Sequence, residues 1–282
     1  MTSEDPVRLA FSPDGDDAFM FWALLRGKID TEGLRFVAEQ HDTESLNAMA
    51  DREAVDVLAV SMARYAAIAD RYLLLPHGAS VGRGYGPVVV APSALPLADL
   101  AGKRVAVPGL RTTAYLVLRM LLPRFEPVVV PIAPHDLVFQ ALRSGNVDAA
   151  LLIHEGRLTF ESEGFALVAD IGAEWTRMTG LPLPLGVNVI RRGLGAERIA
   201  RISRVCRRSI VWALEHKEEV MTELLAHPGP LDRESLDRYL GMYANADTEG
   251  MAEDVVRAMD QLFERGARLG LVTERPVIEL AP

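Results

Sequence analysis

The chain has 282 residues, of which 49% are hydrophobic and 24% are charged, so it can bury one large core or the cores of two lobes. Its net charge of -9 disfavours nucleic acid as a partner, because phosphate binding needs Lys and Arg gathered on one face. One cysteine, Cys206, excludes an internal disulfide, and apolar runs such as 149–153 are far shorter than the ~20 residues of a membrane span.

The first part of the chain predicts alternating strands and helices. The opening MTSEDPVRLAF has acidic residues and no apolar signal segment, so we expect a cytoplasmic protein. We expect strands at 7–11, 34–40 and 55–61, and helices at 16–26, 43–51 and 62–72. Such alternation is typical of a mainly parallel sheet with helices on both faces.

A second α/β unit begins near residue 92. Its expected strands are 102–109, 127–132, 147–153 and 165–171, its expected helices are 112–122 and 135–145, and the tail is helical over 195–226, 231–242 and 250–269. The Pro- and Gly-rich run 180–192 then returns the chain to the first unit. We therefore predict lobe I from 1–90 and 186–282 and lobe II from 91–185, with a ligand cleft between them.

The loop SPDGDDAF, residues 12–19, separates the first strand from the first helix. Ser12, Asp14, Asp16 and Asp17 can cap that helix, with Pro13 and Gly15 making the turn. The same helix start can instead face the cleft and hold an anionic or hydroxylated ligand. Both interpretations remain open, since capping uses only some of the backbone donors.

Two further loops are candidate ligand contacts. VGRGYGP, residues 81–87, lacks the Lys and Ser or Thr of a phosphate loop, so we interpret it as a hinge or cleft-lining turn with Arg83 free to meet a carboxylate. Thr112 and Thr113 begin a helix, where hydroxyls and free N–H groups favour an anion. N-capping by Thr112 explains that position equally well.

His154 is the strongest catalytic candidate. It follows the apolar run AALLI, at the carboxyl end of an expected strand, where α/β clefts place reacting groups. A histidine side chain ordinarily titrates near neutral pH, so this one can accept a proton from a substrate. Glu155 or Arg157 can orient it. We expect the other histidines in turns or exposed helices: His41, His77, His135, His216 and His227.

The sequence indicates neither a metal site nor a serine nucleophile. The spacing of Cys, His and acidic residues matches no metal site, and no G-x-S-x-G nucleophile motif occurs. The amphipathic run 255–272 favours packing within the chain over a dimer contact, so the oligomeric state stays open.

Five stretches carry a family resemblance, in this order: FSPDGDDAFMFWALLRGKIDTEGL, DVLAVSMARYAAIADRYLLLPHGASVGRGYGP, RTTAYLVLRML, ALLIHEGRLTF and GLPLPLGVNVIRR. The chain resembles the 1,4-dihydroxy-6-naphthoate synthases of the futalosine route to menaquinone, and related menaquinone-biosynthesis or solute-binding proteins. The resemblance implies an α/β, two-lobed periplasmic-binding-protein type II fold. It also implies a cofactor-free lyase, acting on cyclic dehypoxanthinyl futalosine to release 1,4-dihydroxy-6-naphthoate.

The resemblance further assigns roles to individual residues. His154, in the HEG motif, corresponds to the proposed general base, and Ser61, Thr112 and Thr113 correspond to positions that hold hydroxyls and a carboxylate of the small anionic substrate.

One departure concerns the first loop, which is typically SPCPNDTF in this family. Asp16 replaces Asn there, and its negative charge near a substrate carboxylate calls for compensation by Arg83 or a helix terminus. A sibling enzyme for another cyclic or aromatic acid, or a non-catalytic solute-binding protein, therefore stays an alternative.

Overall fold

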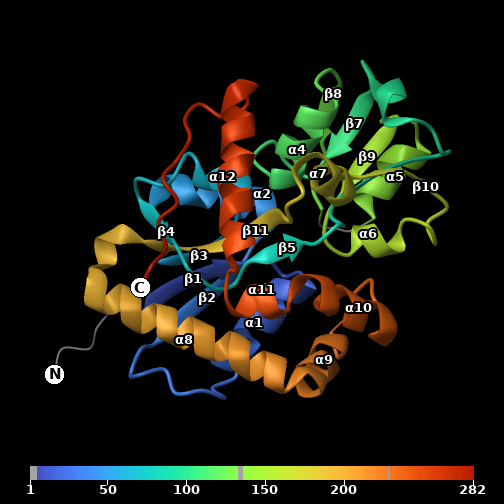
Figure 1. Ribbon diagram of the computed structural model, residues 1–282. Helices are drawn as coiled ribbons and strands as arrows, with labels where there is room; N and C mark the ends of the chain where they lie inside the picture. Colours follow the sequence, from blue (N-terminus) through green and yellow to red (C-terminus); the bar gives the residue numbers. More distant parts are fainter. Residues whose placement is uncertain (1–4, 133–135, 228) are drawn as a thin grey trace.

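The structure, a computed structural model, describes residues 5–132, 136–227 and 229–282, and its strands form one sheet in each of two lobes (Figure 1). The sheet of the first lobe runs in the order β2 (Phe36–Gln40), β1 (Val7–Phe11), β3 (Val57–Ser61), β11 (Leu183–Arg191) and β4 (Tyr72–Leu74), and β5 (Ser80–Gly82) also pairs with β11. β1 is parallel to β2 and β3, whereas β11 is antiparallel to β3. All residues of β3 are buried, as expected for a central strand covered on both faces.

The sheet of the second lobe runs in the order β10 (Ala166–Asp170), β6 (Val88–Ala91), β9 (Ala149–Leu152), β7 (Arg104–Val107) and β8 (Glu126–Val129). Every residue of β9 is buried, because β6 and β7 flank it. The turn after β9 therefore leaves the sheet at its carboxyl edge and carries His154 with it.

Helices cover both sheets. They are α1 (Gly15–Leu25), α2 (Thr43–Met49), α3 (Met62–Tyr65), α4 (Thr113–Leu121), α5 (Leu137–Arg143), α6 (Gly156–Thr159), α7 (Ile171–Thr179), α8 (Ala196–Glu215), α9 (Lys217–Leu225), α10 (Arg233–Tyr243), α11 (Ala246–Glu249) and α12 (Glu253–Arg268). In the first lobe α8 packs on α1, and the red α12 packs on β11 and α4 (Figure 1). The apolar face of α12 is buried in the chain's own core, which explains its amphipathic pattern.

Several details differ from the sequence-based expectations, among them the helix expected over 195–226, which divides at His216 into α8 and α9, and α7, which was not expected. The helix expected over 62–72 ends at Tyr65, because the following turns bring Tyr72 directly into β4. His77 lies in the turn region after β4, as one of the two expectations had it, but it is 1% exposed and contacts the Ser203 hydroxyl, and burial lowers its pKa to about 4. His135 lies outside the described residues.

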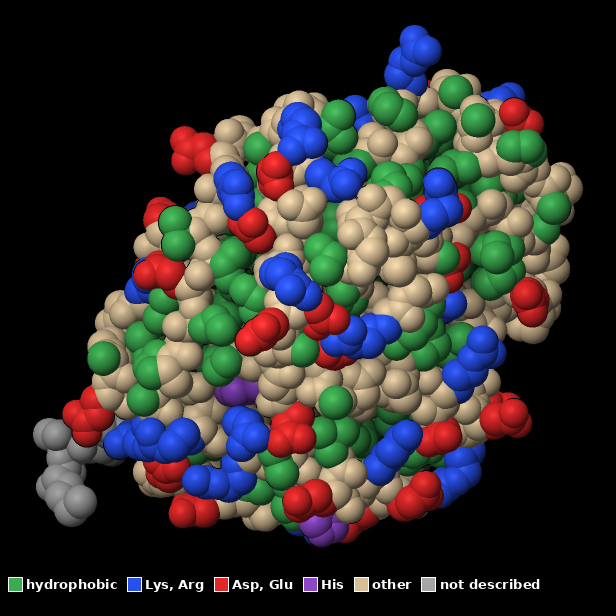
Figure 2. All heavy atoms as spheres, viewed as in Figure 1, with side chains coloured by type: hydrophobic (Ala, Val, Ile, Leu, Met, Phe, Trp, Pro, Cys, Tyr) green, Lys and Arg blue, Asp and Glu red, His purple; other side chains and the backbone are tan. Residues whose placement is uncertain are grey.

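Charged residues are spread over the surface. On the face drawn in Figure 2, acidic and basic side chains are interspersed across both lobes. Cys206 is buried in α8, as the sequence predicts, and burial raises the pKa of its thiol to about 12. Within the described ranges, every helix is too short or too polar to cross a membrane.

Close backbone contact joins the first crossing between the lobes, at Tyr85 and Gly86, to the start of α7. A side chain on Gly172 would overlap the backbone of Tyr85 and Gly86. We therefore expect Gly172→Ala to lower the melting temperature, by the equivalent of about 1–3 kcal/mol of overpacking. Gly241→Ala is the matched control: a methyl group there meets nothing within 4 Å, and the helix gains propensity. Equal melting temperatures for the two variants would contradict this account of the crossing.

Candidate active site

A cavity of about 760 Å³ of atom-free space, mouth included, lies between the two lobes. Both lobes supply its walls, with Ser12, Asp16, Asp17, Thr43, Ser61, Gly78, Ser80, Gly186, Asn188 and Tyr239 from the first and Pro87, Thr112, Thr113, Ala114, Ile153, His154 and Arg157 from the second. The sequence-predicted residues Ser12, Asp16, Ser61, Thr112, Thr113 and His154 thus meet in one cavity.

His154 enters this cavity from the turn that follows β9. Its backbone has φ of +49°, a conformation uncommon outside glycine, because the chain turns sharply between the strand and α6. The Nε2 atom lies 3.0 Å from the Thr43 hydroxyl of the opposite lobe. The Nδ1 atom lies 3.2 Å from Asp14 Oδ2 and 3.3 Å from the Tyr239 hydroxyl. Both ring nitrogens therefore have polar partners supplied by the first lobe.

Two buried carboxyl groups flank the histidine. Burial is the largest cause that raises the pKa of Asp14 to about 7, partly opposed by the hydrogen bond from the Ser12 hydroxyl. Burial also raises the pKa of Glu155 to about 7, with a further contribution from Asp14 and an opposing one from His154. Glu155 accepts a hydrogen bond of 3.0 Å from Gly15 N, so it holds the start of α1 against the second lobe.

The remaining carboxylates of the first loop have partners within the first lobe. Asp16 accepts hydrogen bonds from the Ser80 hydroxyl at 2.6 Å and from the Tyr239 hydroxyl at 2.9 Å. Asp17 accepts one from Ser12 N at 2.8 Å, and burial raises its pKa well above the ordinary value. Asp14 is the N-cap of α1, but its side chain makes no capping hydrogen bond. Its carboxylate meets His154 instead, so capping does not account for this residue.

The three hydroxyl residues expected to hold ligand also support the walls. Ser61 accepts from Asn47 Nδ2 at 3.1 Å, and its backbone N–H donates to the same side chain at 2.9 Å. Thr112 caps α4 through Tyr115 N at 3.2 Å, as one of the two interpretations expected. Thr113 donates to Leu185 O at 2.7 Å, joining α4 to β11.

Arg83 does not lie in the cavity wall, which corrects its expected role. Its guanidinium donates to Asp247 and Asp254, each at 2.7 Å, so both carboxylates occupy it. The guanidinium in the wall belongs to Arg157, which bonds to Asp170 at 2.7 Å and also to a backbone carbonyl. Of the two groups expected to compensate negative charge on the ligand, the helix terminus at Thr112 and Thr113 is the one that lines the cavity.

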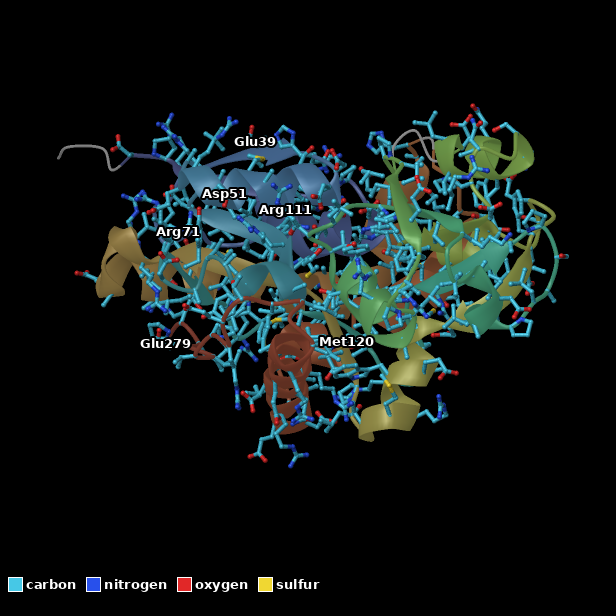
Figure 3. The ribbon with its side chains drawn as sticks, turned by 90° about the horizontal axis from the view of Figure 1, so that it is seen from above. Glu39, Asp51, Arg71, Arg111, Met120 and Glu279 are labelled. Carbon is cyan, nitrogen blue, oxygen red and sulfur yellow. The ribbon has the colours of Figure 1, made fainter. Side chains whose placement is uncertain are left out.

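A salt bridge joins the lobes beside the mouth of the site. Arg111, just before α4, reaches Glu44 of α2 at 2.8 Å. Seen from above, Arg111 lies where the blue first-lobe elements approach the green second-lobe elements (Figure 3). The salt bridge therefore links α2 to the start of α4. These two elements also supply Thr43 and Thr112 to the cavity wall.

Sequence reasoning missed Thr43, Tyr239 and Asn188. Thr43 looks like an ordinary helix start, and Tyr239 lies in a helical tail whose apolar spacing indicates only packing. Asn188 carried the one available signal: it is an amide in an otherwise apolar strand, VNVI.

Comparison with known proteins places the chain in a family. A family model described as menaquinone biosynthesis matches residues 7–268. The 1,4-dihydroxy-6-naphtoate synthase of Thermus thermophilus is 39% identical over 96% of this chain and 98% of its own length. The crystal structure of protein AF1704 from Archaeoglobus fulgidus is 43% identical with a TM-score of 0.89, over 95% of this chain and 98% of that one.

Solved structures of low identity share the fold. The alkanesulfonate-binding protein SsuA from Xanthomonas axonopodis pv. citri has a TM-score of 0.74 at 15% identity, covering 99% of this chain and 98% of that one. Other neighbours of this kind are a periplasmic aliphatic sulphonate binding protein from Escherichia coli and a Candida albicans protein with the generic periplasmic binding protein fold, which confirms the predicted fold class. The extent of the family match and the identity to a named synthase show that the chain is an enzyme of the menaquinone-biosynthesis family.

Proposed function

We propose that the protein is a cofactor-free lyase that converts cyclic dehypoxanthinyl futalosine to 1,4-dihydroxy-6-naphthoate, with His154 as general base. The observation that carries this proposal is the imidazole in the wall of the interlobe cavity, with a carboxylate 3.2 Å from one nitrogen. The names of its relatives support the reaction. When a substrate hydroxyl loses its proton to His154, the adjacent carbon–carbon bond can break: the oxygen becomes the carbonyl of the fragment that leaves, and the electron pair goes to the ring fragment. The ring fragment takes up a proton from the imidazolium and becomes aromatic, which drives the step.

The partners of the imidazole suit it to accept a proton. An ionised Asp14 keeps the ring proton on Nδ1, which leaves Nε2 as the acceptor. The Thr43 hydroxyl lies 3.0 Å from Nε2 and lines the cavity, so it marks where a substrate proton approaches. Once His154 is protonated, the Asp14 carboxylate stabilises the imidazolium.

This arrangement predicts a dependence of the rate on pH. With a pKa of about 7, Asp14 is mostly neutral at pH 6 and mostly ionised at pH 8. Since only the ionised form stabilises the imidazolium, kcat is expected to rise about tenfold across that range. Initial rates at saturating substrate measure it, and a flat profile from pH 6 to 8 would contradict the role of the carboxylate.

The charges of the cavity also orient the substrate. Asp16 lines the end of the cavity beside Tyr239, and its carboxylate disfavours a second anion there. The start of α4, with Thr112 and Thr113, offers backbone N–H groups and the positive end of the helix dipole. We therefore place the substrate carboxylate there and the bond that breaks beside His154.

Incubation of the purified protein with cyclic dehypoxanthinyl futalosine tests this function. Formation of 1,4-dihydroxy-6-naphthoate, followed by absorbance and mass, is the expected result. Failure to form product, together with stabilisation by an aromatic acid, would favour a related enzyme or a solute-binding protein instead.

A further inference from the structure

Asn188 is a buried amide without a hydrogen-bond partner. It lies in β11 and is 1% exposed, and neither its Oδ1 nor its Nδ2 is paired with any group in the described part of the chain. Leaving such groups unpaired costs free energy, and buried side-chain amides are normally bonded. Asn47, equally buried, has both amide atoms bonded to Ser61. The contrast indicates that the amide of Asn188 is available to a ligand in the cavity.

The register of the sheet places Asn188 on the floor of the cavity. Gly186 pairs with Ser61 of β3 and with Ser80 of β5, so these three residues share one face of the sheet. Asn188, two residues further along the strand, lies on that same face. Gly186 has no side chain, which leaves a hollow bordered by polar residues.

The two serine hydroxyls around the hollow each have a partner within the protein, unlike the amide of Asn188. The Ser80 hydroxyl donates to Asp16, and the Ser61 hydroxyl accepts from Asn47. A side chain at Gly78, where φ is +77°, would overlap Asn188 Nδ2, so glycine is what lets the amide fit there. The amide is thus held in place by backbone, with one acceptor and two donor hydrogens to offer.

We propose that Asn188 binds a hydroxyl group of the substrate or product, with Oδ1 accepting its proton and Nδ2 donating to its oxygen. A hydroxyl satisfies both amide atoms, whereas a carboxylate would place an anionic oxygen against Oδ1. The proposal rests on the proposed function in using the same cavity. Leu185, whose backbone oxygen accepts from Thr113, lies three residues from Asn188 in β11, which is about 10 Å along the strand.

The test compares two probes and three proteins. Wild type, Asn188→Leu and Asn47→Leu are titrated calorimetrically with 1,4-dihydroxy-6-naphthoate and with naphthalene-2-carboxylate, which lacks hydroxyl groups. Wild type is expected to prefer the hydroxylated acid about tenfold, and Asn188→Leu is expected to bind both acids equally. Because Asn188→Leu removes unpaired groups and keeps the shape, its melting temperature should match or exceed wild type, while Asn47→Leu should lose several degrees.

Two results would overturn the subsite. One is an unchanged preference in Asn188→Leu, or no preference in wild type. The other is a loss of melting temperature as large as that of Asn47→Leu, which would mean that the amide is satisfied inside the protein. Turnover of cyclic dehypoxanthinyl futalosine is measured separately. If the protein prefers the hydroxylated acid through Asn188 but shows no turnover, the proposed reaction is wrong and the Asn188 subsite stands. If it shows turnover but no such preference, the Asn188 subsite is wrong and the reaction stands.

Discussion

Replacement of His154 by Gln is expected to lower kcat about 10²- to 10⁴-fold, because it removes the only imidazole among the cavity-lining residues that the structure describes. Gln keeps a polar side chain of similar size but cannot take a proton at neutral pH. The dissociation constant of 1,4-dihydroxy-6-naphthoate should change much less, since Ser61 and the start of α4 are untouched. Steady-state rates and calorimetric titration measure the two effects.

A second histidine serves as the control. His216 is exposed on the first lobe at the junction of α8 and α9, and it contacts the backbone of Trp212. His216→Gln should therefore keep the wild-type rate. If His154→Gln turned over as fast as His216→Gln, another group would have to be the base.

Replacement of Asp14 by Asn is expected to make the enzyme slower and, at pH 8, more stable. The amide keeps the size of the side chain but cannot stabilise an imidazolium, so kcat at pH 8 should fall about 10²-fold or more. Burial raises the pKa of Asp14 from its ordinary 3.8 to about 7. Folding therefore favours the protonated form, and that contribution to stability is lost as pH rises through about 7.

The raised pKa of Asp14 also predicts how much more stable Asp14→Asn is than the wild-type protein at pH 8. At pH 8 the wild-type protein buries a charged Asp14, and Asn removes that cost, so the free energy of unfolding should rise by about 1–3 kcal/mol. As pH falls from about 7 toward 3.8, the ordinary pKa of Asp, the gain should shrink, and it should disappear below 3.8, where Asp14 is neutral in both the folded and the unfolded chain. Asp99→Asn, on the exposed surface, should change neither rate nor stability. A variant that is slow and also less stable at pH 8 would mean that Asp14 has a structural role only.

Local patterns identified the elements that position the site. The buried runs VLAVS and AALL became β3 and β9, and Ser61 at the end of β3 and His154 in the turn after β9 line the same cavity. These predictions succeed because strand periodicity and the carboxyl-edge rule depend on nearby residues and on sheet topology.

Pairings over long sequence distances could not be predicted in this way. Arg83 is held by carboxylates from the helical tail, and Tyr239 of that tail reaches Asp16 and His154. Which side chains meet depends on how α10 and α11 pack beside β5, and no local pattern encodes that packing. The same holds for Asp14, whose position before a helix indicates a cap although its carboxylate faces the second lobe.

A single-turnover experiment tests the central claim most directly. Chelator-treated wild-type protein in excess over cyclic dehypoxanthinyl futalosine, at pH 8 and without added nucleotide or metal, should convert all of the substrate to 1,4-dihydroxy-6-naphthoate, while His154→Gln holds it unchanged. Conversion at equal rates by both proteins, or conversion by wild type only after a metal or nucleotide is added, would contradict a cofactor-free reaction with His154 as its base.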